Sequence, residues 1–200
     1  MDVDIVDRDC GSVIDDHERG YLVARDSCPS MTKGLWQNDE RYLEEYWSTW
    51  DDVWDHGDWA LVDEDGFWYL LGRADDVINV AGKRIGPSEV ESAVLDHDGI
   101  TQAVAIGVPD DTKGSAIVVY AITDGAEPDD DLRAELSELV TDYLGKPFAP
   151  REILFVEEFP RTQSGKIVRR AIEGAYTDGE IGDLSSLENP GALGAINDAS

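Results

Sequence analysis

The chain has 200 residues, of which 42% are hydrophobic, and a net charge of −28 from 44 acidic and 16 basic residues. This length and composition predict one domain, or a small domain with a further piece attached, and enough apolar residues for a core. The negative charge argues against nucleic-acid binding because a phosphate backbone would be repelled, and the apolar runs are too short for a membrane-spanning helix.

The distribution of charged residues also predicts the cellular compartment of the protein. The first ten residues, MDVDIVDRDC, are acidic where a signal peptide needs a basic region and then an apolar one, which predicts a cytoplasmic protein. Acidic residues are spread along the whole chain and only five of the bases are lysines, as is typical of proteins in a high-salt cytoplasm. An ordinary acidic protein is the alternative. Cys10 and Cys28 form no C-x-x-C pair, so no thiol metal site is predicted.

Residues 1–73 are predicted to be a β-rich piece that contains one helix. The two apolar runs around Asp65-Gly66 are a strong hairpin signal, and Asn38 is a suitable cap for the helix. The expected elements are a strand, a helix and the two hairpin strands: Gly20–Arg25, Asp39–Trp47, Trp59–Val62 and Phe67–Leu71. These strands are too few to close a sheet, so the piece resembles the edge of something larger.

Residues 74–176 are predicted to form an α+β domain, and residues 177–200 a flexible tail. Pro87 is suited to the first position of a helix, and Asp129–Leu144 has its leucines on one stripe and Gly145 at its end. Ile167–Tyr176 is predicted as a last short helix. Three apolar runs predict strands: Ile100–Val108, Ser115–Thr123 and Ile153–Val156.

Two basic segments, Leu71–Val94 and Pro160–Arg170, stand out in this acidic chain. In the second, Lys166 follows Gly165, which allows the backbone to turn tightly next to a ligand. A lysine is a compact charge that can neutralise a developing phosphate charge. Pro160 occupies the position of the first glycine of G-x-x-x-x-G-K, so this is not a P-loop. An exposed loop lysine is the alternative.

Several other polar residues are candidates for ligand binding. Asp58 precedes a strand and could accept hydrogen bonds from a ribose, and Arg73 ends the predicted hairpin. Arg84, in Gly-Lys-Arg, could approach a phosphate. Each of these could equally be a turn or surface residue. Asp75 stands where one pattern gives way to the next, which suits a hinge or a plain turn, and His97 at a predicted helix end suits a cap.

Three segments together resemble motifs of the AMP-forming acyl-CoA synthetases, most closely the acetyl-CoA synthetase branch: GRADDVINVAGKRIGPSEVESAV, PRTQSGKIVRR and HGDWA. In the last motif, His56 stands where the family has Thr. The similarity covers roughly residues 20–175. It implies the small α+β C-terminal domain of the adenylate-forming enzymes, a short sheet flanked by helices, preceded by a β-rich remnant of their large N-terminal domain.

The resemblance implies roles for individual residues. Lys166 would stabilise charge while a carboxylate attacks the α-phosphate of ATP, and Asp75 would be the hinge about which the small domain rotates. The rotation would bring in Ala81 and Gly82, which would line the path of coenzyme A. The residues implied to bind nucleotide are Asp58, Arg73 and Arg84.

The resemblance further implies ATP/AMP, coenzyme A and Mg²⁺ as cofactors. The acetyl branch has a magnesium site after the hinge helix, which matches Leu95, His97 and Ile100. Thr141 stands where that branch has an arginine that contacts coenzyme A, and Lys146 could compensate.

The glycine-rich phosphate loop of the family is not found in the 200 residues. The expectation is therefore the C-terminal portion of an acyl-CoA ligase, inactive alone, whose substrates are a small carboxylate, ATP and coenzyme A. The alternative is a non-catalytic partner or regulatory module that acts with a separate N-terminal domain polypeptide.

Overall fold

The computed structural model describes residues 2–177, 179, 181 and 184–199. The chain divides into two compact units, Met1–Val77 and Ile78–Ser200. The division falls four residues after the boundary predicted from the sequence, at the end of the segment that contains Asp75. Each unit has its own sheet and its own core, and each is described by itself below.

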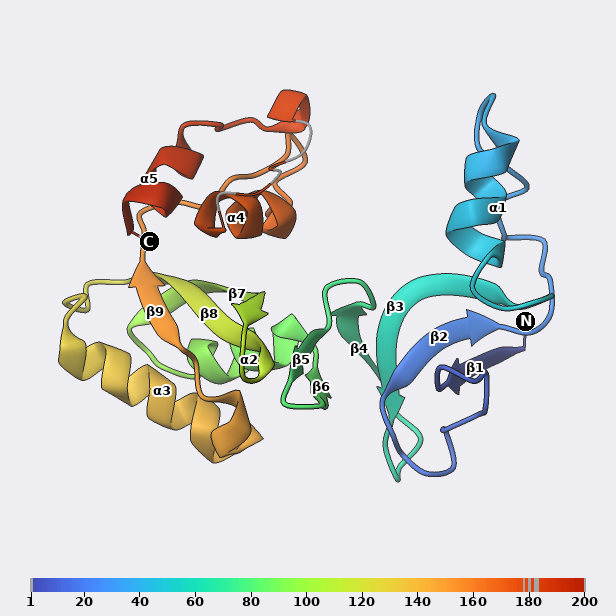
Figure 1. Ribbon diagram of the computed structural model, residues 1–200, viewed down its shortest axis with the longest axis horizontal. Coiled ribbons are helices and arrows are strands. Elements are labelled where there is room, and N and C mark those ends of the chain that lie inside the picture. Colours follow the sequence, from blue (N-terminus) through green and yellow to red (C-terminus); the bar gives the residue numbers. More distant parts are fainter. Residues whose placement is uncertain (1, 178, 180, 182–183, 200) are drawn as a thin grey trace. The chain divides into compact units, whose positions relative to one another are not determined.

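The N-terminal unit is built on an antiparallel sheet with the strand order β1-β2-β3-β4 (Figure 1). The strands are β1 (Val3–Val6), β2 (Gly20–Ala24), β3 (Trp54–Val62) and β4 (Trp68–Arg73). Helix α1 (Asp39–Trp47) has the predicted bounds, and the Asn38 side chain accepts a hydrogen bond from the Arg41 N–H at 3.1 Å. The predicted cap and hairpin are therefore confirmed.

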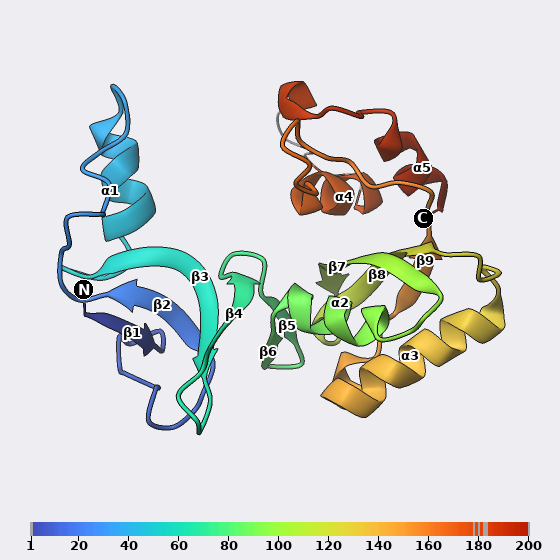
Figure 2. The same ribbon diagram turned by 180° about the vertical axis from the view of Figure 1, so that it is seen from behind.

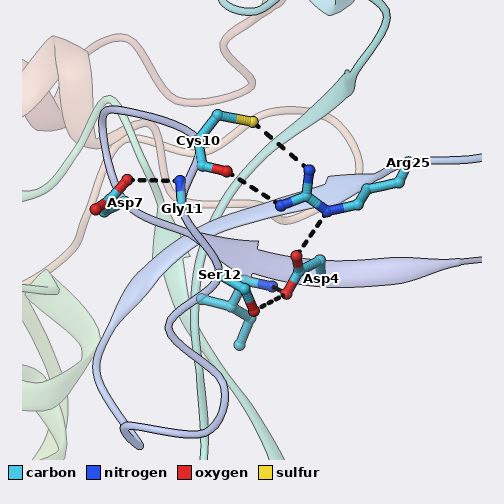
Figure 3. Close-up of polar contacts among 7 residues, drawn as sticks. Asp4, Asp7, Cys10, Gly11, Ser12 and Arg25 are labelled. Atoms are coloured by element: carbon cyan, nitrogen blue, oxygen red, sulfur yellow. Dashed lines mark hydrogen bonds and ion pairs between the residues drawn. The ribbon is translucent and has the colours of Figure 1, made fainter.

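The charged residue Asp4 is buried in β1, with 8% of its surface exposed. Its Oδ2 pairs with the Arg25 Nε at 2.7 Å, and its Oδ1 accepts hydrogen bonds from the Ser12 hydroxyl and the Ile5 N–H (Figure 3). Arg25 also donates to the Cys10 carbonyl. Because a buried carboxylate is costly without partners, this network lets the first strand carry a charge into the core.

The last strand of this sheet, β4, exposes large apolar side chains. Phe67, Trp68, Tyr69 and Leu70 are all exposed. Strand β4 pairs with β3 on one side and stands at the end of the strand order. A contiguous exposed run of this kind usually marks a surface that another protein segment covers.

The C-terminal unit has a five-stranded sheet in which β8 is central (Figures 1 and 2). Strand β8 pairs antiparallel with β7 and β5 and parallel with β9, and β5 pairs with β6. The strands are β5 (Ile78–Val80), β6 (Lys83–Ile85), β7 (Ile100–Asp110), β8 (Gly114–Thr123) and β9 (Glu152–Phe155).

Helices cover both faces of this sheet. The helices are α2 (Pro87–Leu95), α3 (Asp130–Leu144), α4 (Arg169–Tyr176) and α5 (Ala192–Ala199), with short 3₁₀ helices η1 (Lys146–Phe148) and η2 (Leu184–Ser186). Ile117 and Val119 of β8 belong to a core with α2 and α3, whereas Val118 and Tyr120 belong to a core with α4 and α5. This alternation is the period-two pattern of a strand buried on both faces. The predicted α+β class is confirmed.

The prediction of a flexible tail for residues 177–200 is not supported by the described part of this range. Residues 184–186 and 192–199 are helical, and Leu187, Leu193 and Ile196 are buried against α4 and β8. The Gly, Ser and Asn content suggested a loose tail, but these apolar side chains gain more from burial than the ordering of the segment costs.

The helices of residues 2–177, 179, 181 and 184–199 include none that is long and apolar enough to cross a membrane.

Acid titration of Asp110 should lower the stability of the C-terminal unit. The N–H groups of Lys113 and Thr112, and then the Arg151 guanidinium, stabilise the carboxylate and lower the pKa of Asp110 to about 2. Because the folded-state pKa lies below the unfolded value of about 3.9, this contribution is present above that value and is lost as pH falls towards 2. The free energy of unfolding of Asp110→Asn should therefore fall less steeply over this range than that of the unaltered chain. Parallel acid-unfolding curves for the two proteins would contradict the assignment.

Candidate functional site

Asp58 and Arg73 lie opposite each other as backbone partners in β3 and β4. Arg73 Nη1 is 3.7 Å from Asp58 Oδ1, and the His56 Nδ1 is 2.8 Å from the other Asp58 oxygen. Arg73 also donates to the His56 carbonyl at 3.4 Å. The structure thus brings two of the sequence-predicted nucleotide residues together, with His56 as a third member that holds the carboxylate in place.

Gly57 makes room for the Arg73 guanidinium. Its φ is +79°, and a Cβ built on it would lie 2.7 Å from both terminal nitrogens of Arg73. Any side chain here would face backbone strain, and the Arg73 guanidinium, the far end of a long side chain, would have to shift. The close approach of Arg73 therefore explains why the segment HGDWA has a glycine at position 57.

Asp75 lies between this cluster and the start of the C-terminal unit. Its Oδ1 is 3.3 Å from Arg73 Nε, and the Asp76 N–H donates to the Arg73 carbonyl. The Asp75 side chain is exposed, and the two units divide two residues further on, between Val77 and Ile78. Its place near that division is compatible with the predicted hinge, which is not tested by this geometry.

Ala81 and Gly82 form the two-residue turn between β5 and β6. Val80 pairs with Lys83, and both turn residues have positive φ, +51° and +82°, as in the tight turns that join twisted strands. The Ala81 N–H donates to the Lys113 carbonyl, which ties the turn to the β7–β8 connection. No atom lies within 4 Å of a Cβ built on Gly82, so this backbone faces open space where a ligand can approach. Arg84, half-buried in β6, follows directly.

Lys166 lies at the end of a hydrogen-bonded turn between β9 and α4. The Gly165 N–H donates to the Thr162 carbonyl at 2.8 Å, and the Thr162 N–H donates to the Lys166 carbonyl at 2.9 Å. Gly165 has φ +82°, a conformation that favours glycine. The Lys166 side chain is exposed and makes no ion pair within the described part of the chain. A hydrogen-bonded turn therefore presents an ammonium group that has no ion-pair partner among the described residues.

On the C-terminal side of this turn, the chain is anchored by Arg169, the first residue of α4. Its Nη2 is 2.6 Å from Glu91 Oε1 of α2, and its Nε donates to the Ala105 carbonyl of β7 at 3.1 Å. The same Glu91 oxygen accepts the Ala105 N–H at 2.9 Å. One carboxylate thus joins α2, β7 and α4, a role for Glu91 that the sequence analysis missed. The sequence could have pointed to Glu91, because it lies in the segment GRADDVINVAGKRIGPSEVESAV that carries the family resemblance.

On the N-terminal side, the turn is held by Arg161. Its Nη1 donates to the Gly165 carbonyl at 2.7 Å, and its Nη2 donates to the Gln102 side chain of β7. Arg161 also bridges to Ile167 through the backbone, so the turn closes like a small hairpin. Sequence analysis did not single out Arg161, because its partner Gln102 is 59 residues away and its contact with Gly165 depends on the shape of the turn.

The side chains around His97 do not form a metal site by themselves. His97 Nδ1 accepts the Gly99 N–H at 3.0 Å, and its Nε2 is 3.1 Å from Glu135. Leu95 and Ile100 could offer only backbone carbonyls. Within the residues that the structure describes, no three His, Cys, Asp or Glu side chains are grouped to hold an ion. Magnesium binding by Leu95, His97 and Ile100 stays a prediction, and no step below depends on it.

The candidate residues form two sets. Asp58, Arg73 and Asp75 belong to the N-terminal unit, and the other predicted residues belong to the C-terminal unit. Thr141, at the position expected for an arginine, donates its hydroxyl to the Glu138 carbonyl within α3, and Lys146 begins η1. Neither arrangement reveals a ligand contact.

Comparison with known proteins finds a family match within the C-terminal unit. Residues 89–166, which include both Glu91 and Lys166, match the family model of the AMP-binding enzyme C-terminal domain. This segment is therefore similar to the C-terminal domains of AMP-binding enzymes. The sheet and helices described above are therefore those of an adenylate-forming C-terminal domain, in agreement with the fold expected from the sequence.

Curated relatives extend the similarity to both units. The acetyl-coenzyme A synthetase of Pyrobaculum aerophilum is 40% identical over 190 residues, which is 94% of this chain and 28% of that protein. The acetyl-coenzyme A synthetase of Chlorobaculum tepidum is 40% identical over 193 residues, which is 96% of this chain and 29% of that protein. The chain thus spans less than a third of the length of these relatives.

Solved structures agree with this fold. Acetoacetyl-CoA synthetase from Streptomyces lividans covers 98% of the chain with a TM-score of 0.85, at 24% identity and over 30% of its own length. An amide bond synthetase from Marinactinospora thermotolerans covers 88% with a TM-score of 0.76, at 29% identity and over 34% of its own length. Because the acetoacetyl-CoA synthetase is only 24% identical to this chain, its similarity supports the fold alone.

Replacing Gly57 with alanine should destabilise the N-terminal unit and displace Arg73. The positive φ costs about 1 kcal/mol for alanine, and the new Cβ collides with the guanidinium. Gly66→Ala is a matched control because Gly66 has φ +82° and no atom within 4 Å of a built Cβ. Urea unfolding followed by tryptophan fluorescence should show a larger loss for Gly57→Ala. Equal losses would mean that the contact with Arg73 is unimportant.

Removing the Glu91 carboxylate should loosen the attachment of α4. Glu91→Ala leaves the half-buried Arg169 and the Ala105 N–H without this acceptor, at a cost of about 2 kcal/mol, whereas Glu91→Gln retains an oxygen acceptor and should cost less. Asp130→Ala, which removes an exposed pair with Arg133, is the control and should cost less than about 1 kcal/mol. Thermal unfolding of the three variants measures the difference. A loss for Glu91→Ala no larger than the control would contradict the anchoring role.

Proposed function

We propose that this chain is the C-terminal portion of an acetate or acyl-CoA ligase, which converts ATP, a carboxylate and coenzyme A into acyl-CoA, AMP and diphosphate. The observation that carries the proposal is the turn that presents Lys166. It is held on both sides, it displays an exposed lysine without an ion-pair partner among the described residues, and it lies in the segment that matches the family. The relatives named acetyl-coenzyme A synthetase support the choice of reaction.

In the first half-reaction, the carboxylate attacks the α-phosphate of ATP, and diphosphate leaves. Negative charge develops on the phosphate oxygens, and a lysine ammonium group placed against them stabilises the transition state. Lys166 supplies this charge. Asp58 accepts hydrogen bonds from the ribose hydroxyls, and Arg73 and Arg84 contact ribose or phosphate oxygens in one or the other half-reaction.

In the second half-reaction, the thiol of coenzyme A attacks the acyl carbonyl and AMP leaves. The C-terminal unit turns about Asp75, which withdraws Lys166 and brings in the turn of Ala81 and Gly82. The open space around Gly82 suits a backbone that lies along an extended thiol arm. The cofactors are therefore ATP/AMP and coenzyme A.

The exposed strand β4 favours a second reading of the same chain. Phe67, Trp68, Tyr69 and Leu70 offer an apolar surface that a separate AMP-binding domain polypeptide could cover. In that case the chain acts as a partner module, and its activity depends on the polypeptide that it meets.

The test is ATP–diphosphate exchange with acetate in multimolar KCl. It is run on the chain alone and on the chain supplied with the part of the Pyrobaculum aerophilum enzyme that it does not match. Lys166→Ala should lower the adenylation rate about 100- to 1000-fold, because the developing phosphate charge loses its counter-charge. Thioester formation from supplied acetyl-AMP should stay within about twofold of the unaltered rate.

Lys33→Ala is the control, since Lys33 is another exposed lysine and lies outside the candidate site. It should leave both half-reactions unchanged. Equal loss of both half-reactions in Lys166→Ala would contradict the assigned role of Lys166. Exchange by the chain alone would show that it needs no partner, whereas exchange only after mixing is the result expected of a C-terminal portion that is inactive alone.

A further inference from the structure

The segment after η2 runs back along the residues that lead into the Lys166 turn. Leu187 forms an antiparallel bridge with Thr162, and the Glu188 N–H donates to the Arg161 carbonyl at 2.8 Å. Residues 25 and 27 positions apart thereby pair like neighbouring strands. Figure 1 shows α5, to which this segment leads, close to α4, the helix that begins after the turn.

Asn189 is the centre of this contact. Its Oδ1 accepts the Arg161 N–H at 2.8 Å, and its Nδ2 donates to the Phe159 carbonyl at 3.0 Å and to Glu158 Oε2 at 2.7 Å. One amide group therefore satisfies both a donor and an acceptor of the backbone before the turn. An asparagine is suited to this because it carries an acceptor and two donors in one plane.

Arg161 carries this contact on to the turn itself. Its backbone N–H is fixed by Asn189, its carbonyl by Glu188, and its side chain donates to the Gly165 carbonyl. Gly165 precedes Lys166 directly. The position of Lys166 therefore depends, through Arg161, on a segment more than twenty residues further along the chain.

The segment has its own anchor in the core. Leu187, Leu193 and Ile196 are buried in the same cluster as Phe159, which lies directly before the turn. Covering this core would be a sufficient structural reason for α5. It does not explain Asn189, whose amide contacts the backbone at Phe159 and Arg161 and the Glu158 carboxylate.

We propose that residues 184–199 are a clasp that holds the Lys166 turn in its working geometry, with Asn189 as the principal positioning residue. This proposal rests on the proposed role of Lys166. A catalytic charge must be held within a fraction of an ångström of its working position, and a turn on a surface loop rarely achieves that without support. The clasp supplies that support on the side of Arg161, as Glu91 and Arg169 do on the other side.

Hydrogen exchange tests the clasp without any need for catalysis. The Gly165 N–H donates to the Thr162 carbonyl and the Lys166 N–H to the Thr162 hydroxyl, so both amides report on the turn. In the full chain, Asn189→Ala should raise their exchange rates about tenfold, the effect of losing one or two hydrogen bonds. Amides of β8 should be unchanged. Unchanged exchange at Gly165 and Lys166 in a folded Asn189→Ala chain would overturn the proposal.

Two further variants separate the clasp from general stability. Ile106→Ala shortens a buried side chain of the same core, on β7 and outside the clasp, so it should lower the melting temperature and leave turn exchange within about twofold. Asn189→Asp keeps the acceptor for Arg161 but sets an oxygen against both Glu158 and the Phe159 carbonyl, so Glu158→Gln in the same chain should restore slow exchange only in part. If Ile106→Ala loosens the turn as much as Asn189→Ala does, the clasp is no more than core packing.

The kinetic arm uses the mixture described under the proposed function. Asn189→Ala should lower kcat of adenylation about tenfold with KM for acetate unchanged, and should leave thioester formation from acetyl-AMP within about twofold. A fall in both half-reactions alike would overturn the positioning role. If the unaltered chain shows no adenylation in any mixture while Asn189→Ala still loosens the turn, the proposed function fails and the clasp stands as a device that orders the turn.

Discussion

Strand β8 is the constraint on which the C-terminal unit depends. It is hydrogen-bonded to β7, β5 and β9, and its residues from Ala116 to Ala121 are buried. Helices must therefore cover both faces, and the connections between them must run along the margins of the sheet. The two turns of the proposed mechanism lie at these margins. The Ala81–Gly82 turn is tied to β8 through Lys113, and the Lys166 turn follows β9, which lies beside β8.

Several arginines of this acidic chain have a structural role, whereas Lys166 has no such role among the described contacts. Arg25, Arg151 and Arg169 are each paired with a carboxylate at 2.7 Å or less, and Arg161 is fixed by a backbone carbonyl and Gln102. These arginines build the fold, because a guanidinium group makes several directed hydrogen bonds at once. Lys166 makes no ion pair in the described part of the chain, so its charge is available for a ligand.

Elements with local signals could be predicted from the sequence, and elements that depend on distant partners could not. Helix α1 with its Asn38 cap and the stripe of helix α3 are patterns within one segment, so their bounds were predicted within one residue. Strand β5 has three residues and is defined by pairing with β6 and β8. The site followed the same rule, since Lys166 belongs to a motif whereas Glu91 and Asn189 act on partners 78 and 28 residues away.

The rotation in the proposed function needs a unit that moves as one body, and the Glu91–Arg169 pair supports this by joining two of its helices. Helix α2 follows directly on the hairpin of Ala81 and Gly82, and α4 follows directly on the Lys166 turn. The pair joins these two helices through β7, so a displacement of one turn is passed to the other. On the proposed function, withdrawal of Lys166 and arrival of Gly82 are then one event. If the proposed function holds, a loose turn would let the unit rotate without placing its charge or its backbone, so the clasp and the Glu91 anchor would serve the mechanism as well as the fold.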